Sequence, residues 1–212
     1  MKKIMTLVAL LTLVMSFTAC GRYDRSALEN TNAEDRRTDR YETVDDNDDD
    51  TYADYDDYEE YEGGLGDKMQ TAFFDFTVNS AYTCKDYNGY LPADGKILMV
   101  ADVTVTNTMD ETIPMYDTDF QAQWNDDAED AFAYPITLDM ETGDFVEAGY
   151  ASDEQLPYEY ELEEGETREG TLVYEVPEGM RDFSISSLEL FSDGSEGNVY
   201  FVYFTAKSND IL

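Results

Sequence analysis

The sequence contains no histidine and only two cysteines, Cys20 and Cys84. Without histidine there can be no Ser-His-Asp triad and no Cys-His pair, and the commonest zinc ligand is absent as well. Among so many acidic residues, a pair of carboxylates at the spacing that glycosidases use would occur by chance, so such a pair is no evidence of catalysis. We therefore expect a protein that is not an enzyme.

Basic residues are also scarce. The chain has 13 lysines and arginines against 49 aspartates and glutamates, a formal net charge of -36 over 212 residues. Such a molecule repels nucleic acid and anionic lipid, and its natural counterparts are cations or basic surfaces. Nucleic-acid binding is thereby excluded.

No hydrophobic run is long enough to span a bilayer comfortably. The longest extends from Ile4 to Val14, follows Lys2 and Lys3, and leads into small residues before Cys20. A basic start, a short apolar stretch and a small-residue end are the layout of an export signal. Residues 1–19 are therefore predicted to be a signal peptide.

The end of this signal, Thr18-Ala19-Cys20-Gly21, resembles the lipobox of bacterial lipoproteins, although Phe17 stands where leucine is commonest. The resemblance implies that Cys20 is acylated and becomes the first residue of a mature protein held on the extracytoplasmic side of the bacterial cell membrane. Two or three acyl chains, at about 0.8 kcal/mol per buried methylene, give a stable anchor where one chain does not. An ordinary secretory signal with an incidental cysteine is the alternative.

Residues 20–66 are predicted to be a disordered acidic linker. They contain almost no aliphatic side chains, and from Glu42 to Glu62 every charged residue is acidic. Such a segment cannot bury enough apolar surface to fold, and its charge extends it. Tyrosines recur at every third position, at Tyr52, Tyr55, Tyr58 and Tyr61. They are interpreted as part of a solvated spacer, with a sticky strip for a basic or sugar partner as the alternative.

Residues 67–212 are predicted to form one domain, because apolar and polar residues alternate there with period two. Pro92–Gly95, Asn107–Glu111 and Glu163–Glu166 carry the chemistry of turns. Many short strands at hairpin spacing, without a helical stretch, indicate an all-β, antiparallel two-sheet sandwich. Cys84 is expected on a strand, half-buried. The expected strands include Phe74–Val78, Lys96–Thr106, Phe120–Trp124, Leu156–Leu162, Gly170–Val176 and Val199–Thr205.

Two segments of this domain resemble an uncharacterised immunoglobulin-like family found in bacterial lipoproteins and related in fold to the mycobacterial immunoprotective extracellular protein. One is the strand that runs from Pro92 to Asn107. The other is the Gly-Glu turn within Leu162–Glu166, followed by the strand Gly170–Pro177. The resemblance implies an immunoglobulin-like β-sandwich and a surface location. It implies no activity, because the family has no agreed one.

Two kinds of side chain are candidates for binding. Acidic clusters could ligate calcium through hard oxygen atoms, although acidic loops also serve solubility alone. Exposed aromatic rings could bind a sugar or a peptide, although aromatic residues also favour strands for packing. The acidic candidates are Asp117, Asp119, Asp126, Asp127, Glu129 and Asp130, and the aromatic ones are Tyr82, Tyr87, Tyr90, Tyr150 and Trp124.

These patterns predict a membrane-anchored surface lipoprotein with a non-catalytic binding or interaction module. Its lipid contact is the acylated Cys20, and its ligand is an unidentified envelope or extracellular protein or a glycan. The alternative is an extracellular domain that binds calcium or is stabilised by it, with calcium as the only cofactor to consider.

Replacing Cys20 tests the anchor. In Cys20→Ser the acyl acceptor is lost, so the protein should leave the detergent phase of a phase separation in which the wild-type chain is retained. Purified wild-type protein that is water-soluble with an unmodified first residue would contradict the prediction.

Overall fold

The computed structural model describes residues 58–124 and 131–209. The signal peptide, Cys20 and the linker up to residue 57 lie outside these ranges. Within them no α-helix occurs, and no helix is long and apolar enough to cross a membrane. The strands are β1 (Glu60–Gly64), β2 (Lys68–Gln70), β3 (Phe74–Cys84), β4 (Lys96–Asn107), β5 (Ile113–Tyr116), β6 (Gln121–Trp124), β7 (Phe132–Ala133), β8 (Glu159–Leu162), β9 (Thr167–Pro177), β10 (Asp182–Leu190), β11 (Glu196–Thr205) and β12 (Lys207–Ser208), with 3-10 turns η3 (Asp117–Asp119) and η4 (Glu147–Gly149).

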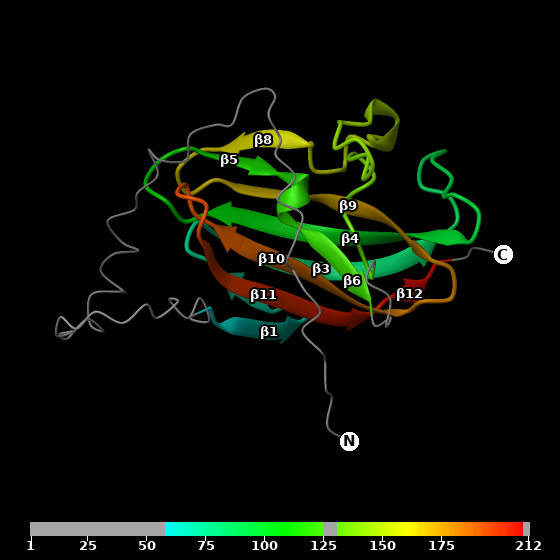
Figure 1. Ribbon diagram of the computed structural model, residues 1–212, viewed down its shortest axis with the longest axis horizontal. Helices are drawn as coiled ribbons and strands as arrows, with labels where there is room; N and C mark the ends of the chain where they lie inside the picture. The colour runs from blue at the N-terminus through cyan, green and yellow to red at the C-terminus, as the bar shows by residue number, and fades with distance from the viewer. Residues whose placement is uncertain (1–57, 125–130, 210–212) are drawn as a thin grey trace, which may run out of the picture.

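The strands form two main sheets that face each other (Figure 1). One sheet has the order β1-β11-β10-β6-β7, and the other has the order β12-β3-β4-β9, with β2 also on β3. A two-stranded sheet, β5-β8, lies beside β9. The predicted all-β, immunoglobulin-like sandwich is confirmed. The pairing is antiparallel except at two edges, where β1 joins β11 and β12 joins β3 in parallel.

The core lies between the two sheets and consists of the predicted period-two stripes. Phe76 and Val78 of β3, Val105 of β4, and Ile185 and Val202 of the facing sheet are all at most 1% exposed. Burying such a side chain fully contributes roughly 1.5–3 kcal/mol. Phe120, which precedes β6, packs its ring edge-on against Phe76 at 5.4 Å and closes this core.

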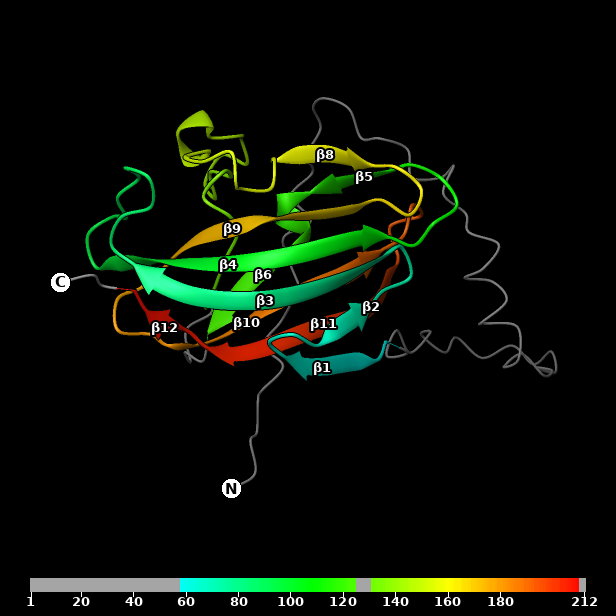
Figure 2. The same ribbon diagram turned by 180° about the vertical axis from the view of Figure 1, so that it is seen from behind.

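A second apolar cluster lies on the outer face of the β4-β9 pair. Leu98, Val100 and Val173 are completely buried there, covered by Ile136 and by Tyr87. The backbone N–H of Ile136 donates to the Val173 carbonyl at 2.8 Å, which fixes the segment between β7 and β8 along the β9 edge of the sheet (Figure 2). The apolar first half of β4 therefore correctly predicted a central strand buried on both faces. Cys84, at 6% exposed, is buried rather than half-buried.

Strand β1 extends the sandwich into a range that the sequence analysis assigned to the linker. Glu60–Gly64 pairs with Val199–Tyr203 of β11, and the ring of Tyr61 stacks on Tyr200 at 5.0 Å. Tyr61 is therefore part of a strand and not of a spacer. The linker was predicted to end at Gly66, so a fragment that begins at Asp67 lacks an edge strand of the folded domain.

The side chain of Asn107 joins two turns at the end of β4. It is 1% exposed, and its amide nitrogen donates to the carbonyls of Glu111 at 2.7 Å, Leu162 at 3.0 Å and Glu163 at 3.0 Å. Its amide oxygen accepts from the N–H of Met109 at 2.8 Å. Asn107 thus connects the turn after β4 to the β8-β9 turn, and it is the last residue of the first segment that carried the family resemblance.

Removal of this amide should destabilise the fold. Asn107→Ala removes the side-chain partner of two buried backbone groups, the Leu162 carbonyl and the Met109 N–H, each at a cost of about 1–3 kcal/mol, so we expect a loss of about 2–4 kcal/mol in the free energy of unfolding. Asn79→Ala is the matched control, because Asn79 is exposed and bonds only to the Thr104 hydroxyl, at 2.9 Å. It should change stability by about 0.5 kcal/mol or less. Equal losses in urea denaturation would show that Asn107 has no special role.

Candidate functional site

The predicted calcium ligands do not assemble into a site within the described residues. Asp126, Asp127, Glu129 and Asp130 lie outside these residues. Asp119 turns its carboxylate back to accept from the N–H of Tyr116 at 2.9 Å, while Asp117 points inward. In residues 58–124 and 131–209 no group of three or more Asp, Glu, His or Cys side chains could hold a metal ion. The described structure gives the calcium alternative no support.

Asp117 is instead a buried acid with an incomplete set of partners. It is 1% exposed, Thr137 donates its hydroxyl hydrogen to Oδ2, and Oδ1 has no hydrogen-bond partner among the described residues. Burial raises the pKa of Asp117 to about 7, and the bond from Thr137 only partly opposes this shift. The hydroxyl of Tyr160 is a second buried polar atom without a partner in the described chain.

Of the five predicted aromatic candidates, only Tyr150 lines an open groove. Trp124 and Tyr87 are at most 8% exposed and belong to the two apolar clusters. Tyr82 and Tyr90 are half-buried, and the Tyr90 hydroxyl donates to Glu175 at 3.2 Å. Most of the aromatic candidates therefore pack within the sandwich or against it.

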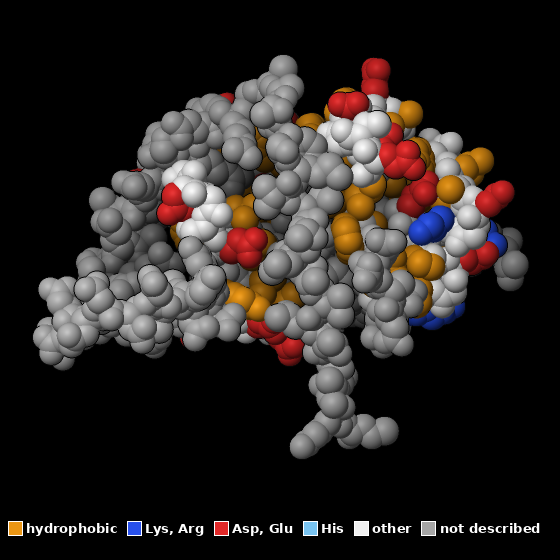
Figure 3. Space-filling model, in the orientation of Figure 1, with side chains coloured by type: hydrophobic (Ala, Val, Ile, Leu, Met, Phe, Trp, Pro, Cys, Tyr) orange, Lys and Arg blue, Asp and Glu red, His pale blue; other side chains and the backbone are white. Residues whose placement is uncertain are grey.

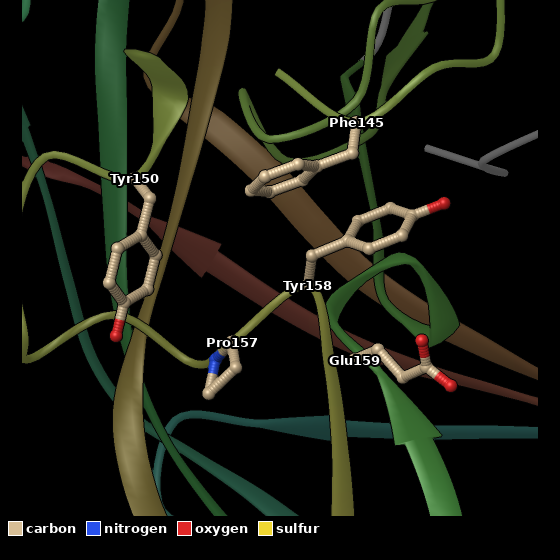
Figure 4. Close-up of a pocket in the computed structure, with 5 residues that line it drawn as sticks. All are labelled: Phe145, Tyr150, Pro157, Tyr158 and Glu159. Atoms are coloured by element: carbon tan, nitrogen blue, oxygen red, sulfur yellow. The ribbon is translucent and has the colours of Figure 1, made fainter. Parts of the chain in front are cut away.

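The groove is shallow and almost entirely apolar. Figure 4 shows Tyr150 on one side of it and the rings of Phe145 and Tyr158 on the other, with Pro157 between them. The rings of Phe145 and Tyr158 pack at 5.2 Å, and Tyr116 packs edge-on against Tyr158 at 6.4 Å. Phe145 is 48% exposed and Tyr150 is 37% exposed. Glu159 completes the lining. This is an exposed cluster of rings on an otherwise acidic part of the chain.

A tight loop presents Phe145. Asp139 Oδ1 accepts from the N–H groups of Glu141 at 2.8 Å and Thr142 at 3.0 Å, and these bonds lower the pKa of Asp139. Gly143 follows with φ of 75°, a conformation that glycine adopts without strain. The chain then returns, and the N–H of Val146 donates to the Thr137 carbonyl at 2.8 Å. Phe145 is thus held on a closed turn.

Close packing places Tyr150. The preceding Gly149 lies so near the Ile136 backbone that a Cβ would approach the Ile136 carbonyl oxygen to 2.1 Å, so only glycine fits. The buried side chain of Gln155 then accepts from the N–H of Ala151 at 2.7 Å and donates to the Gly149 carbonyl at 2.9 Å. The Tyr150 backbone is therefore fixed on both sides.

Asp117 connects the groove to the body of the sandwich. Its backbone N–H donates to the carbonyl of Tyr158 at 3.2 Å, and its carboxylate holds Thr137 at the base of the Phe145 loop. The buried acid therefore lies under two of the three groove rings. It acts on their backbone positions, because its own oxygens are not exposed.

The stretch of chain that carries the groove has acidic residues and no basic ones. Residues 97–167, which include every lining residue, contain no lysine or arginine. The pKa of Tyr158 is raised by burial and then by the charges of Asp117, Glu159 and Asp144. Figure 3 shows acidic side chains gathered over the loop between β7 and β8, with hydrophobic surface next to them. The next base in the sequence, Arg168, lies 4.8 Å above the Tyr160 ring and pairs with Glu166.

Sequence reasoning missed four of the five lining residues: Phe145, Pro157, Tyr158 and Glu159. Tyr158 and Glu159 had been assigned to a strand from Leu156 to Leu162, whereas β8 begins at Glu159. The available signal was an isolated Phe145 between acids in a loop, since a large apolar residue there has no strand to support it.

The chain belongs to a family described as a domain of unknown function (DUF4352), whose pattern matches residues 63–199. No curated protein sequence matches the chain. The expected relation to the mycobacterial immunoprotective extracellular protein stays a prediction.

Several solved structures resemble this one at low sequence identity. The yjhA protein of Bacillus subtilis has 16% identity and a TM-score of 0.47 over 69% of this chain and 99% of its own. A candidate lipoprotein of the same organism, ycdA, has 13% identity and a TM-score of 0.45 over 68% of this chain and 40% of its own, so the likeness spans less than half of that protein. An uncharacterised β-sandwich protein of Clostridium difficile has 16% identity and a TM-score of 0.38 over 70% of this chain and 96% of its own. No functional conclusion rests on these likenesses.

The buried acid predicts a specific pH dependence of stability. The pKa of Asp117 rises from an ordinary 3.8 to about 7 on folding, so between these values the folded state holds a proton that the unfolded state has released. The contribution of Asp117 to stability is greatest below pH 3.8, falls as the pH rises to 7, and is constant above. Within this window the slope approaches about 1.4 kcal/mol per pH unit at most.

Asp117→Asn should remove this slope, so the variant should gain stability relative to wild type as the pH rises from 5 to 8. Urea denaturation at the two pH values measures the difference, in which the pH-independent cost of the substitution cancels. Asp153→Asn is the control, because it removes one exposed carboxylate. If both variants change in parallel with wild type, Asp117 is not the titrating group.

Proposed function

We propose that this chain is a bacterial surface lipoprotein, anchored at Cys20, whose β-sandwich is a non-catalytic module that binds an envelope or extracellular partner through the groove at Phe145, Tyr150 and Tyr158. The observation that carries the proposal is the groove itself. Exposed aromatic rings that are fixed by a supporting loop supply large contact areas at little entropic cost.

The placement of the groove supports this role. Glu60, the first residue of β1, pairs with Val199 near the start of β11, so β1 begins beside the β10-β11 turn. The chain that leads back toward Cys20 therefore joins the sandwich at the end of the molecule where this turn lies. The loop that carries Phe145 and Tyr150 lies toward the opposite end of the molecule (Figures 1 and 2). A tether attached at one end leaves the other end free to meet a partner.

The chemistry of the described residues supports a non-catalytic module. Asp117, the one acid of residues 58–124 and 131–209 with a pKa raised to about 7, is 1% exposed and cannot reach a substrate, and Cys84 is 6% exposed. General acid–base catalysis needs a titrating group within hydrogen-bond reach of the reacting atom, and a nucleophile needs a base beside it. The groove offers rings and one carboxylate, which are suited to holding a ligand.

Affinity capture tests the proposal. The full chain in detergent is immobilised and exposed to a bacterial envelope extract, beside a Phe145→Ser, Tyr158→Ser double variant. The matched control is Leu91→Ser, Leu190→Ser, which removes two large hydrophobic side chains exposed elsewhere, 66% and 48% respectively. We expect one component to be retained by wild type and by the control, and to be lost with the groove variant. Equal retention by all three proteins, or none by any, would refute binding through the groove.

A further inference from the structure

We propose that the groove binds the cationic side chain of an arginine or a lysine in a basic polypeptide segment. This inference rests on the proposed function and names the chemistry of the ligand. Three observations carry it: the cluster of exposed rings, the acidic charges that act on Tyr158, and the absence of any lysine or arginine from residue 97 to residue 167.

Three aromatic residues line the same opening. Tyr150 stands across Pro157 from the packed pair of Phe145 and Tyr158 (Figure 4). The face of an aromatic ring carries partial negative charge, and a guanidinium or ammonium group within about 6 Å of its centre is attracted to it. Arginine is the better fit, because its flat guanidinium stacks on rings while its stem covers apolar surface.

Neighbouring acids supply the countercharge. Glu159 follows Tyr158 and lines the groove, although its carboxylate points away from Tyr150 and Pro157 in Figure 4. The charges of Glu159 and Asp144 both act on Tyr158. A carboxylate beside an aromatic face is a favourable combination for a cation, since the ion pair and the ring attraction act on the same group.

The electrostatics of the region exclude an anionic ligand. No lysine or arginine occurs from residue 97 to residue 167, and Asp144 and Glu159 both act on Tyr158. A field of one sign speeds the approach of the opposite sign and repels its own. Arg168 does not offset this field at the groove, because its guanidinium is already stacked on Tyr160 and paired with Glu166.

The same kind of contact already exists within the fold. Arg168 lies 4.8 Å from the centre of the Tyr160 ring. Tyr160 is the residue of β8 that directly follows the groove residues Tyr158 and Glu159. This internal contact has three members: the ring face of Tyr160, the guanidinium of Arg168 and the carboxylate of Glu166. The groove repeats the tyrosine and the glutamate and exposes them, so that a cation from outside can complete the set.

Calorimetric titration with two short peptides tests the inference. The full chain in detergent at 0.15 M salt, where charges beyond about 8 Å are screened, is titrated with Gly-Arg-Gly-Arg-Gly and with the same peptide containing citrulline. Citrulline has the shape of arginine without its charge. We expect the arginine peptide to bind at least about fivefold more tightly. Equal affinity for the two peptides, or no binding of either, would overturn the inference.

Matched variants distinguish binding at the groove from attraction to the overall negative charge of the protein. Glu159→Gln should weaken binding of the arginine peptide about threefold to tenfold. Glu161→Gln removes the same charge from an exposed position two residues along β8 that does not line the groove, and it should have no such effect. Phe145→Leu and Tyr158→Leu keep apolar bulk but remove a ring face, and each should weaken binding. If Glu159→Gln and Glu161→Gln behave alike, the attraction is diffuse and the inference is wrong.

The two proposals can fail separately. If affinity capture shows a groove-dependent partner while the arginine peptide is not preferred over its citrulline form, the groove binds a ligand of another class. A neutral sugar oligomer whose binding depends on Phe145 and Tyr158 would be that outcome, because sugars stack on rings without needing charge. If no groove-dependent partner is captured and neither peptide binds, both proposals are refuted.

Discussion

The buried amide of Asn107 is the constraint on which the site depends. It holds the turn after β4 and the β8-β9 turn at one point, through the carbonyls of Glu111, Leu162 and Glu163. The small β5-β8 sheet is thereby fixed relative to β4 at one end. Its other end carries Tyr116, η3 and Tyr158, which form one wall of the groove and its support. An amide at the far end of this small sheet thus fixes the strand pair that leads to Tyr158.

The groove lies on a layer of loop rather than on a sheet, and its rigidity has to come from polar bonds. Asp139, Gln155 and the Asp117–Thr137 contact each fix a segment of this layer, while Ile136 attaches it to the outer face of β9. Asp117 makes its contribution at a cost, since a carboxyl group with one unpaired oxygen is poorly solvated in the interior. A buried carboxyl group that lowers stability is typically kept where it holds a functional site in position, here the rings of the groove.

The strands that could be predicted from the sequence are those in which every second side chain is buried in the core. β3, β4, β9 and β11 show that period clearly. β10 was not predicted, because its inward side chains change from apolar at Phe183 and Ile185 to polar at Ser187 and Glu189. The buried Glu189 carboxylate is tolerated because the N–H groups of Ala72 and Asn198 and the hydroxyl of Tyr200 donate to it. β1 shows no signal beyond Tyr61. The groove could not be predicted, since its rings come from loop positions that only the fold brings together.

The parallel pairing of β1 with β11 has a mechanical consequence. The chain toward Cys20 leaves from the start of β1, and the groove lies toward the opposite end. In the proposed arrangement, tension between an anchored terminus and a held partner would act along the strand axis. Under such a load the backbone bonds from Glu60 to Gly64 share the force at once and do not open one after another. The edge strand is oriented to resist pulling in shear, and a domain tethered in this way can keep its hold on a moving partner without unravelling from its attachment.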